Sequence, residues 1–186
     1  MSETPRGEQP EEFEQEPKIE ITEYSGQYKE QIVRLINDVY ENEIGQHSES
    51  GRPDLDKISE VYQKENGNFW VALDGEKVIG TIGLINQGEQ RASLHRFCVA
   101  KRFRGKGVSN RLFSTFLGFA YDKDYEKIFL STWAGAKAAN KFYTKNGFKR
   151  IEFLPEDLSH RSYFVHDKVF YGLDLKEVNK EKQNKV

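Results

Sequence analysis

Apolar positions alternate with polar ones near the start of the chain and then recur at helical spacing. Residues 18–24 (KIEITEY) have the period-two pattern of a half-buried strand. From Tyr28 onward, apolar residues fall three and four positions apart, as on one face of a helix, and a second stripe of this kind covers residues 55–62. The pattern therefore predicts a strand and two amphipathic helices, with a polar loop over residues 41–53 between the helices.

The next segment has the pattern of a β-hairpin. Two apolar runs, residues 69–73 and 78–85, flank an Asp-Gly pair, which is a common turn signal. Gly80 and Gly83 inside the second run predict a bulge or a close approach by another backbone. Residues 86–90 are polar and predict a loop.

The second half of the chain alternates between strand-like and helix-like stretches. The predicted elements, in order, are a central strand at 94–100, a helix at 108–120, a strand at 128–130, a helix at 136–143 ended by Gly147, and strands at 148–153 and 163–173. Strands pair at both ends and alternate with helices in the middle. This order predicts an α/β (α+β) fold with a single mixed, mostly antiparallel central sheet flanked by helices.

Length and composition predict one domain. A chain of 186 residues is large enough for a substantial core. Residues 1–17 are rich in carboxylates and proline, and we expect them to form a disordered acidic tail. The expected domain covers residues 18–175, followed by a charged C-terminal tail at 176–186.

Charge and cysteine content exclude several classes of protein. The net charge of −2 provides no overall attraction to nucleic acid or to an anionic membrane. The single cysteine, Cys98, excludes an intramolecular disulfide and fits a reducing compartment. The sequence contains no apolar run of roughly 20 residues and no signal-peptide pattern at the N-terminus. We therefore expect a soluble cytoplasmic protein, monomeric or homodimeric, with no nucleic-acid and no membrane partner.

A basic, glycine-containing loop between the central strand and the next helix is the strongest chemical signal. Its cations and glycines are Lys101, Arg102, Arg104, Gly105, Lys106 and Gly107. Glycine lets the backbone approach an anion without a Cβ in the way, and the first N–H groups of a helix have no partner inside the helix. The loop therefore predicts a phosphate-bearing ligand. It lacks the spacing of a Walker loop.

Two segments resemble the signature motifs of one family. Residues 104–109 (RGKGVS) resemble the pyrophosphate-binding pattern Gln/Arg-x-x-Gly-x-Gly/Ala of the GNAT superfamily of acetyl-CoA-dependent N-acetyltransferases. Residues 139–148 (ANKFYTKNGF) resemble the family's helix with the pattern A-x-x-x-Tyr-x-x-x-Gly-Phe. The resemblance extends over residues 69–175 and implies a GNAT-like fold, with acetyl-CoA as the acetyl donor and no metal.

The resemblance also implies which residues contact the cofactor. The central strand of the family separates from its neighbour, and its free backbone groups bind pantetheine. The residues implied as cofactor-binding are Phe97, Cys98, Val99, Arg104, Gly105, Lys106, Gly107, Val108, Ser109, Ser131 and Asn140. Ser109 replaces the usual Gly or Ala, and Ala136 stands where many members have asparagine.

The resemblance implies a catalytic acid but leaves the catalytic base open. Tyr143 matches the family's tyrosine that protonates the departing thiolate, as a general acid. Some relatives carry a basic glutamate at the position of Ser93, and serine cannot serve as that base. His95, two residues further on the same strand face, and Glu89, in the preceding loop, are the candidate bases, with a water chain as the alternative.

The function implied is transfer of the acetyl group of acetyl-CoA to a primary amine of a small molecule or a peptide by direct attack. The alternative is a non-catalytic acyl-CoA-binding module of the same fold. A nucleic-acid contact through the basic loop is disfavoured, because the sequence shows no aromatic stacking surface beside it. We expect the first two helices and the loops at 46–52 and 157–167 to select the acceptor. Acidic residues there, including Glu41 and Asp157, suit a cationic acceptor.

Overall fold

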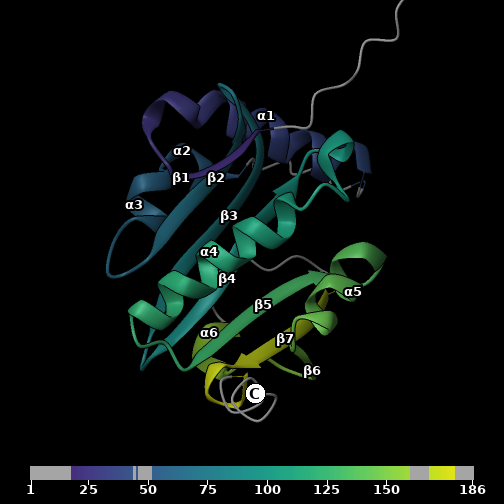
Figure 1. Ribbon diagram of the computed structural model, residues 1–186. Helices are drawn as coiled ribbons and strands as arrows, with labels where there is room; N and C mark the ends of the chain where they lie inside the picture. Colours follow the sequence, from purple (N-terminus) through teal and green to yellow (C-terminus); the bar gives the residue numbers. More distant parts are fainter. Residues whose placement is uncertain (1–17, 44, 46–51, 160–167, 179–186) are drawn as a thin grey trace, which may run out of the picture.

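A seven-stranded mixed sheet forms the centre of the protein (Figure 1). The computed structural model describes residues 18–43, 45, 52–159 and 168–178. The strands are β1 (Ile19–Glu23), β2 (Asn68–Asp74), β3 (Lys77–Gly88), β4 (Arg91–Val99), β5 (Lys127–Trp133), β6 (Lys149–Ile151) and β7 (Lys168–Asp174). Their spatial order is β1-β2-β3-β4-β5-β7-β6, and every neighbouring pair is antiparallel except β4 and β5. The predicted fold class is confirmed.

Helices cover both faces of the sheet. They are the 3₁₀ helix η1 (Gly26–Tyr28), α1 (Lys29–Asn37), the π-helix η2 (Asp38–Glu43), α2 (Pro53–Asp56), α3 (Ile58–Tyr62), the 3₁₀ helix η3 (Lys101–Phe103), α4 (Val108–Asp122), α5 (Lys137–Lys145) and α6 (Glu156–Ser159). The long helix α4 crosses one face of the sheet together with α5, while α1, α2 and α3 pack on the other face (Figure 1).

Successive side chains of β2 point to opposite faces of the sheet, so they divide between two apolar clusters. Trp70 and Ala72 join the apolar cluster under α4, whereas Phe69 and Val71 join the cluster under α1 and α3. All four side chains are at most 3% exposed. A strand covered on both faces has a continuous apolar run rather than an alternating one, as β2 does.

The glycines of β3 mark close approaches, as predicted: by side chains at both positions, and also by the backbone at Gly80, where an added Cβ would lie 3.2 Å from the carbonyl oxygen of Cys98. A Cβ on Gly80 would lie 2.9 Å from Cδ1 of Leu112 in α4. A Cβ on Gly83 would lie 2.8 Å from the ring of Tyr62 in α3. The predicted bulge is also present, because the β2–β3 register shifts next to Ala72, the partner of Gly80. These glycines let helices on opposite faces lie close to the sheet.

Several predicted boundaries were wrong. The first helix continues beyond residue 41 as the π-helix η2, and the second stripe divides into α2 and α3. The expected loop at 86–90 is instead the end of β3 and a two-residue turn at Glu89 and Gln90, with φ of 50° and 57°. Positive φ at both positions is what a tight hairpin turn requires, and Asn or Gly usually signals it. Helix α6 was not predicted.

The predicted tails lie mostly outside the described residues, which include neither 1–17 nor 179–186. Residues 176–178 are described, and Val178 packs against the core beside Leu175, which is 1% exposed. Packing of the domain therefore continues to Val178. Along the part of the chain that the structure describes, no helix has the length and apolar character needed to cross a bilayer.

Candidate active site

Strands β4 and β5 are paired over only three residues before they separate. Arg91, Ala92 and Ser93 of β4 face Lys127, Ile128 and Phe129 of β5. Beyond Ser93 and Phe129, the described residues of the two strands form no further pairs, although β4 stays paired with β3 to Val99 and β5 stays paired with β7 to Trp133. One edge of each strand therefore faces an opening in the sheet. Unpaired backbone groups at such an edge can hydrogen-bond a ligand.

A β-bulge on β4 shapes this edge. Residue 98 faces Thr81 and residue 95 faces Gly83, so β4 carries one more residue than β3 across this interval. Arg96 takes up the extra residue with φ of +49°, and the hydroxyl of Thr81 donates to its carbonyl oxygen at 2.7 Å. As a result, the successive side chains of His95 and Arg96 both extend toward the α1–α3 side of the sheet. A bulge re-aims side chains in this way.

Arg96 is fixed by a buried carboxylate that sequence reasoning missed. Its Nε and Nη2 donate to the two carboxylate oxygens of Asp54 at 2.8 and 2.6 Å. The hydroxyl of Tyr62 donates to the same carboxylate at 2.7 Å, and the Arg96 guanidinium lies 5.4 Å from the ring centre of Tyr40. Asp54 is 2% exposed. Helix α2 is thereby tied to the bulge through a bidentate, charge-assisted pair.

The electrostatics of this cluster follow from its burial. Desolvation by itself would raise the pKa of Asp54, but the hydrogen bonds and positive charge of Arg96 outweigh it, and the pKa is lowered. Burial raises the pKa of Tyr62 well above its ordinary value, and the Asp54 carboxylate raises it further. Asp54 is therefore ionised and Tyr62 is a neutral donor at physiological pH.

Two glycines of the loop that is predicted to bind phosphate are left-handed. Gly105 and Gly107 have φ of 76° and 82°, and a Cβ built on either would meet no atom within 4 Å. These glycines are required by their left-handed conformation rather than by crowding. Gly107 caps α4, whose first turn contains no acidic residue. Arg104 folds back to donate from Nε to the carbonyl oxygen of Val99 at 3.0 Å, so it ties the loop to the end of β4.

Tyr143 lies on α5 against the open edge of β4. Its ring centre is 6.3 Å from that of Phe97 and 5.9 Å from that of Tyr171, and its side chain is part of the α4 cluster. Tyr143 is 5% exposed, and burial raises its pKa well above the ordinary value for a tyrosine. The phenol therefore keeps its proton at neutral pH.

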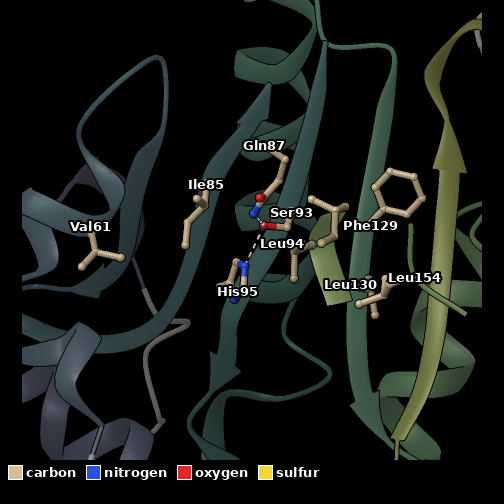
Figure 2. A pocket seen from close by; sticks show the side chains of 10 residues that line it. Val61, Ile85, Gln87, Ser93, Leu94, His95, Phe129, Leu130 and Leu154 are labelled. Carbon is tan, nitrogen blue, oxygen red and sulfur yellow. Dashed lines mark hydrogen bonds between the residues drawn. The ribbon is translucent and has the colours of Figure 1, made fainter. Parts of the chain in front are cut away.

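On the other face, Ser93 and His95 lie in one hydrogen-bonded row with Gln87 (Figure 2). Nε2 of Gln87 donates to Oγ of Ser93 at 2.5 Å, and Oγ lies 2.7 Å from Nε2 of His95. Oγ of Ser93 therefore lies between the Gln87 amide and the imidazole, and the direction of its bond to Nε2 follows the tautomer of His95. The expectation that Ser93 and His95 share a face is confirmed.

Other predicted site residues have different surroundings. Glu89 sits in the β3–β4 turn, 82% exposed and paired with Arg91 at 3.1 Å, and the structure does not bring it to Ser93 and His95. The Asn140 amide donates to the carbonyl oxygens of Trp133, Ala134 and Ala136, a set of contacts that holds the β5–α5 turn.

Cys98, Val99 and Ser131 lie on the two strands of the opening. Cys98 and Val99 are buried at 4% and 6% exposure, Cys98 on the α1 side and Val99 on the α4 side. Ser131 pairs with Phe170 of β7, in the part of β5 that no longer pairs with β4. Of the three, Cys98 and Val99 contribute buried side chains, and only their backbones can reach a ligand in the opening.

Comparison with solved structures identifies similar folds. An acetyltransferase of the GNAT family from Staphylococcus aureus Mu50 superimposes with a TM-score of 0.78 at 28% identity, over 84% of this chain and 99% of that one. The PaiA N-acetyltransferase of Thermoplasma acidophilum, solved in complex with coenzyme A, superimposes with a TM-score of 0.68, over 84% of this chain and 99% of that one. Its identity is 19%, so it supports the fold alone.

Comparison with characterised sequences gives N-acetyltransferases. N-acetylaspartate synthetase of Xenopus tropicalis is 36% identical over 102 residues, which are 54% of this chain and 38% of that protein. Human N-acetyltransferase 8B is 35% identical over 105 residues, 53% of this chain and 46% of that protein. The chain thus spans less than half the length of either relative. The model of the acetyltransferase (GNAT) family matches residues 30–148, more than half of the chain, and the chain belongs to this family.

Proposed function

We propose that the protein transfers the acetyl group of acetyl-CoA to a primary amine of a small molecule or a peptide by direct attack. The observation that carries the proposal is the opening between β4 and β5, which leads to a left-handed glycine loop and the N-terminus of α4. An extended ligand with a phosphate at one end fits such a site, because strand edges offer hydrogen bonds and a helix N-terminus favours an anion. Family membership supports the same activity.

The residues of the opening fit acetyl-CoA. Backbone N–H groups of the predicted segment 104–109 would hold the pyrophosphate, except that of Arg104, which donates to Lys101, and the exposed cations of the loop would assist. Those backbone groups of Phe97, Cys98 and Val99 that face the opening would hold the pantetheine arm along β4, apart from the Val99 carbonyl oxygen, which already accepts from Arg104. When bound, acetyl-CoA supplies an activated acyl group and a thiolate leaving group. The contacts of Asn140 support a structural role in the turn more than direct contact with the cofactor.

Each remaining catalytic task has a candidate group in the chain. A main-chain N–H at the β4 bulge would polarise the carbonyl group as negative charge develops. Tyr143, protonated at neutral pH, would donate a proton to the leaving thiolate. His95 Nε2 would receive the proton of the amine, directly or through the Ser93 hydroxyl 2.7 Å away. His95 is favoured over Glu89, whose carboxylate is exposed at the far turn.

The test is a transfer assay with a panel of primary amines, following thiol release and the mass of the product. Acetylated product from any amine, dependent on acetyl-CoA, supports the proposal. Binding of acetyl-CoA without any acetylated product would instead support the non-catalytic binding module, which the serine at position 93 favours. A cytoplasmic location and a monomeric or homodimeric state belong to the same proposal, and the buried single thiol Cys98 fits a reducing compartment.

A matched pair of substitutions at Gly107 tests the phosphate site. Asn and Asp have nearly the same shape, and both tolerate the left-handed conformation of this residue better than other side chains do. We expect Gly107→Asp to bind CoA at least tenfold more weakly than Gly107→Asn, a difference of about 1.4 kcal/mol, because only Asp adds a negative charge beside the pyrophosphate. Isothermal titration calorimetry measures both affinities. Equal affinities for the two variants would contradict the assignment.

A further inference from the structure

A small pocket lies at the point where β4 and β5 separate, on the α3 side of the sheet (Figure 2). Its volume is about 100 Å³. Val61 and Ile85 lie on one side of it and Leu154 on the other (Figure 2), and Leu158 of α6 also lines it. The row of Gln87, Ser93 and His95 supplies its polar groups.

The position of the pocket links it to the proposed reaction. Ser93 and Phe129, which form the last β4–β5 pair, both line it. It therefore adjoins the opening from the face opposite α4 and α5. An amine bound here would approach the open edge of β4 from the side that the proposed cofactor site leaves free.

An ion pair connects α6, which carries Leu158, to β4. Nη1 and Nη2 of Arg91 donate to the carboxylate of Asp157 at 3.2 and 2.7 Å, and this clip joins α6 to β4. Leu158, the next residue, is 3% exposed and faces the pocket. The ion pair thus connects the Leu158 side of the pocket to β4.

The pocket contains no formally charged side chain. Among its described lining residues there is no Asp, Glu, Lys or Arg, and His95 is its only titratable group. Two of the acidic residues that the sequence offered for a cationic acceptor are engaged elsewhere, Asp157 with Arg91 and Glu41 with Arg52 at 3.3 Å. Burying a charged group here would be costly without a partner. The pocket therefore favours an uncharged, apolar group.

One buried acceptor of the pocket, Oε1 of Gln87, is unpaired among the described residues. Oε1 of Gln87 is buried and, among the described residues, has no hydrogen-bond partner, while Nε2 of the same amide is bonded to Ser93. A buried acceptor left unpaired is destabilising, and each such atom calls for an explanation. An N–H group of a ligand, beside the Ser93–His95 pair, would satisfy it.

We propose that this pocket selects the acceptor: a primary amine that carries an uncharged aliphatic or aromatic arm next to the amino group. The arm lies between the apolar side chains on the two sides of the pocket, and the amine lies at Gln87 and His95. A comparable apolar cavity of about 150 Å³ holds a benzene molecule, so a pocket of about 100 Å³ suits a branched four-carbon arm. The inference rests on the proposed acetyl transfer and adds the chemical class of the acceptor.

The test uses amines of nearly equal shape. L-leucinamide, L-asparaginamide and L-aspartic acid α-amide have arms that are apolar, polar and negatively charged, and glycinamide has no arm. We expect kcat/KM for leucinamide to exceed that for the polar and charged amides at least tenfold. Rates within twofold of one another, or a preference for a polar arm, would overturn the pocket assignment while leaving the transferase activity established.

Two sets of variants connect the preference to the pocket. Val61→Phe fills the space from α3, and we expect the advantage of leucinamide over glycinamide to disappear. Gln87→Leu and Gln87→Glu both lose the amide donor to Ser93, but only Glu keeps an acceptor, so KM for leucinamide should be about tenfold higher in Gln87→Leu than in Gln87→Glu. An undiminished leucinamide advantage in Val61→Phe, with CoA affinity intact, would overturn the assignment.

Failure of the proposed activity can be told apart from failure of this inference. If none of the four amides is acetylated, calorimetric titration of leucinamide and asparaginamide into the CoA-saturated protein measures the pocket directly. Binding of leucinamide that is absent in Val61→Phe would support the pocket and count against acetyl transfer to amines of this class. No binding of leucinamide to the CoA-saturated wild-type protein would overturn the pocket assignment as well.

Discussion

Tyr143→Phe is expected to lower kcat by about 10²–10⁴-fold, the range for loss of a general acid, while folding and CoA affinity persist. Phenylalanine keeps the ring, which packs against Phe97, Phe148 and Tyr171. It removes the only proton that this side chain can give to the departing thiolate. Steady-state kinetics with a good amine substrate, together with calorimetry of CoA binding, measure the two effects separately.

The pH dependence of the wild-type protein gives a second measure of the same role. Because burial raises the pKa of Tyr143 above its ordinary value of about 10, the acid form stays populated as the pH rises from 7 to 10. We therefore expect no loss of kcat from deprotonation of Tyr143 within this interval. A fall in kcat between pH 7 and 9 that disappears in Tyr143→Phe would contradict the raised pKa.

A matched control is available at the other end of the sheet. Tyr125 precedes β5, is 6% exposed, and donates its hydroxyl to the carbonyl oxygen of Asn66 at 2.9 Å. Tyr125→Phe also removes a phenolic proton, but away from the opening, and should leave kcat within about twofold of wild type. The same small effect for Tyr143→Phe, with CoA binding intact, would make Tyr143 a core residue and not the acid.

Asp54→Ala is expected to destabilise the protein by about 3–5 kcal/mol, the cost of leaving a buried partner charge unpaired. Asp54 is 2% exposed, and the side chain of its partner Arg96 is 14% exposed. The substitution also leaves the Tyr62 hydroxyl without its acceptor. Urea unfolding at neutral pH measures the loss, and an effect below about 1 kcal/mol would show that the pair contributes little.

The pH dependence of this loss has a definite sign. Arg96 holds the pKa of Asp54 below its unfolded value of about 3.9, so the stabilisation is complete above that value and falls as the pH drops through the lower folded pKa. The stability gap between the wild type and Asp54→Asn should therefore be full at pH 7 and narrow below about pH 4. A gap that stays constant down to pH 2 would contradict the lowered pKa.

The exposed pair Arg34 and Glu30 is the control for burial. Its atoms lie 3.4 Å apart with side chains 80% and 85% exposed, and such pairs on a helix contribute about 0.3–0.5 kcal/mol. Glu30→Ala should therefore change the stability far less than Asp54→Ala. In addition, the double variant Asp54→Asn with Arg96→Gln should recover part of the single-variant loss, because two neutral amides can still hydrogen-bond.

Local signals in the sequence sufficed for the centre of the fold. The apolar run of β4, the glycines Gly105 and Gly107 and the apolar stripe of α4 follow one another directly. Each of these elements can therefore be predicted from its own residues. The hairpin of β2 and β3 was equally clear from Asp74 and Gly75. In these segments the turn residues and the apolar periodicity predict the same secondary structure.

The features that were missed depend on residues far apart in the sequence or on unusual turn residues. Asp54 follows Pro53 at the start of a short helix, where a carboxylate is ordinarily a surface residue, and its partner Arg96 is in another element. The only available signal was Arg96 itself, a cation inside an apolar strand. The bulge on β4 could not be predicted, because one added residue changes the strand pairing without changing the composition. Glu89 and Gln90 do not resemble a positive-φ turn.

The short β4–β5 contact divides the sheet into two ribbons, one of β1 to β4 and the other of β5, β7 and β6. With three pairs, this seam is as short as the β6–β7 pairing, but among the described strands it is the only ladder that joins the two ribbons. Those amide protons of Phe97 to Val99 and Leu130 to Trp133 that face the opening, rather than β3 or β7, should exchange with solvent readily. A bound acyl-CoA would lie between the ribbons as an additional strand. Ligand concentration would then set both amide exchange across the seam and the force needed to part the two halves.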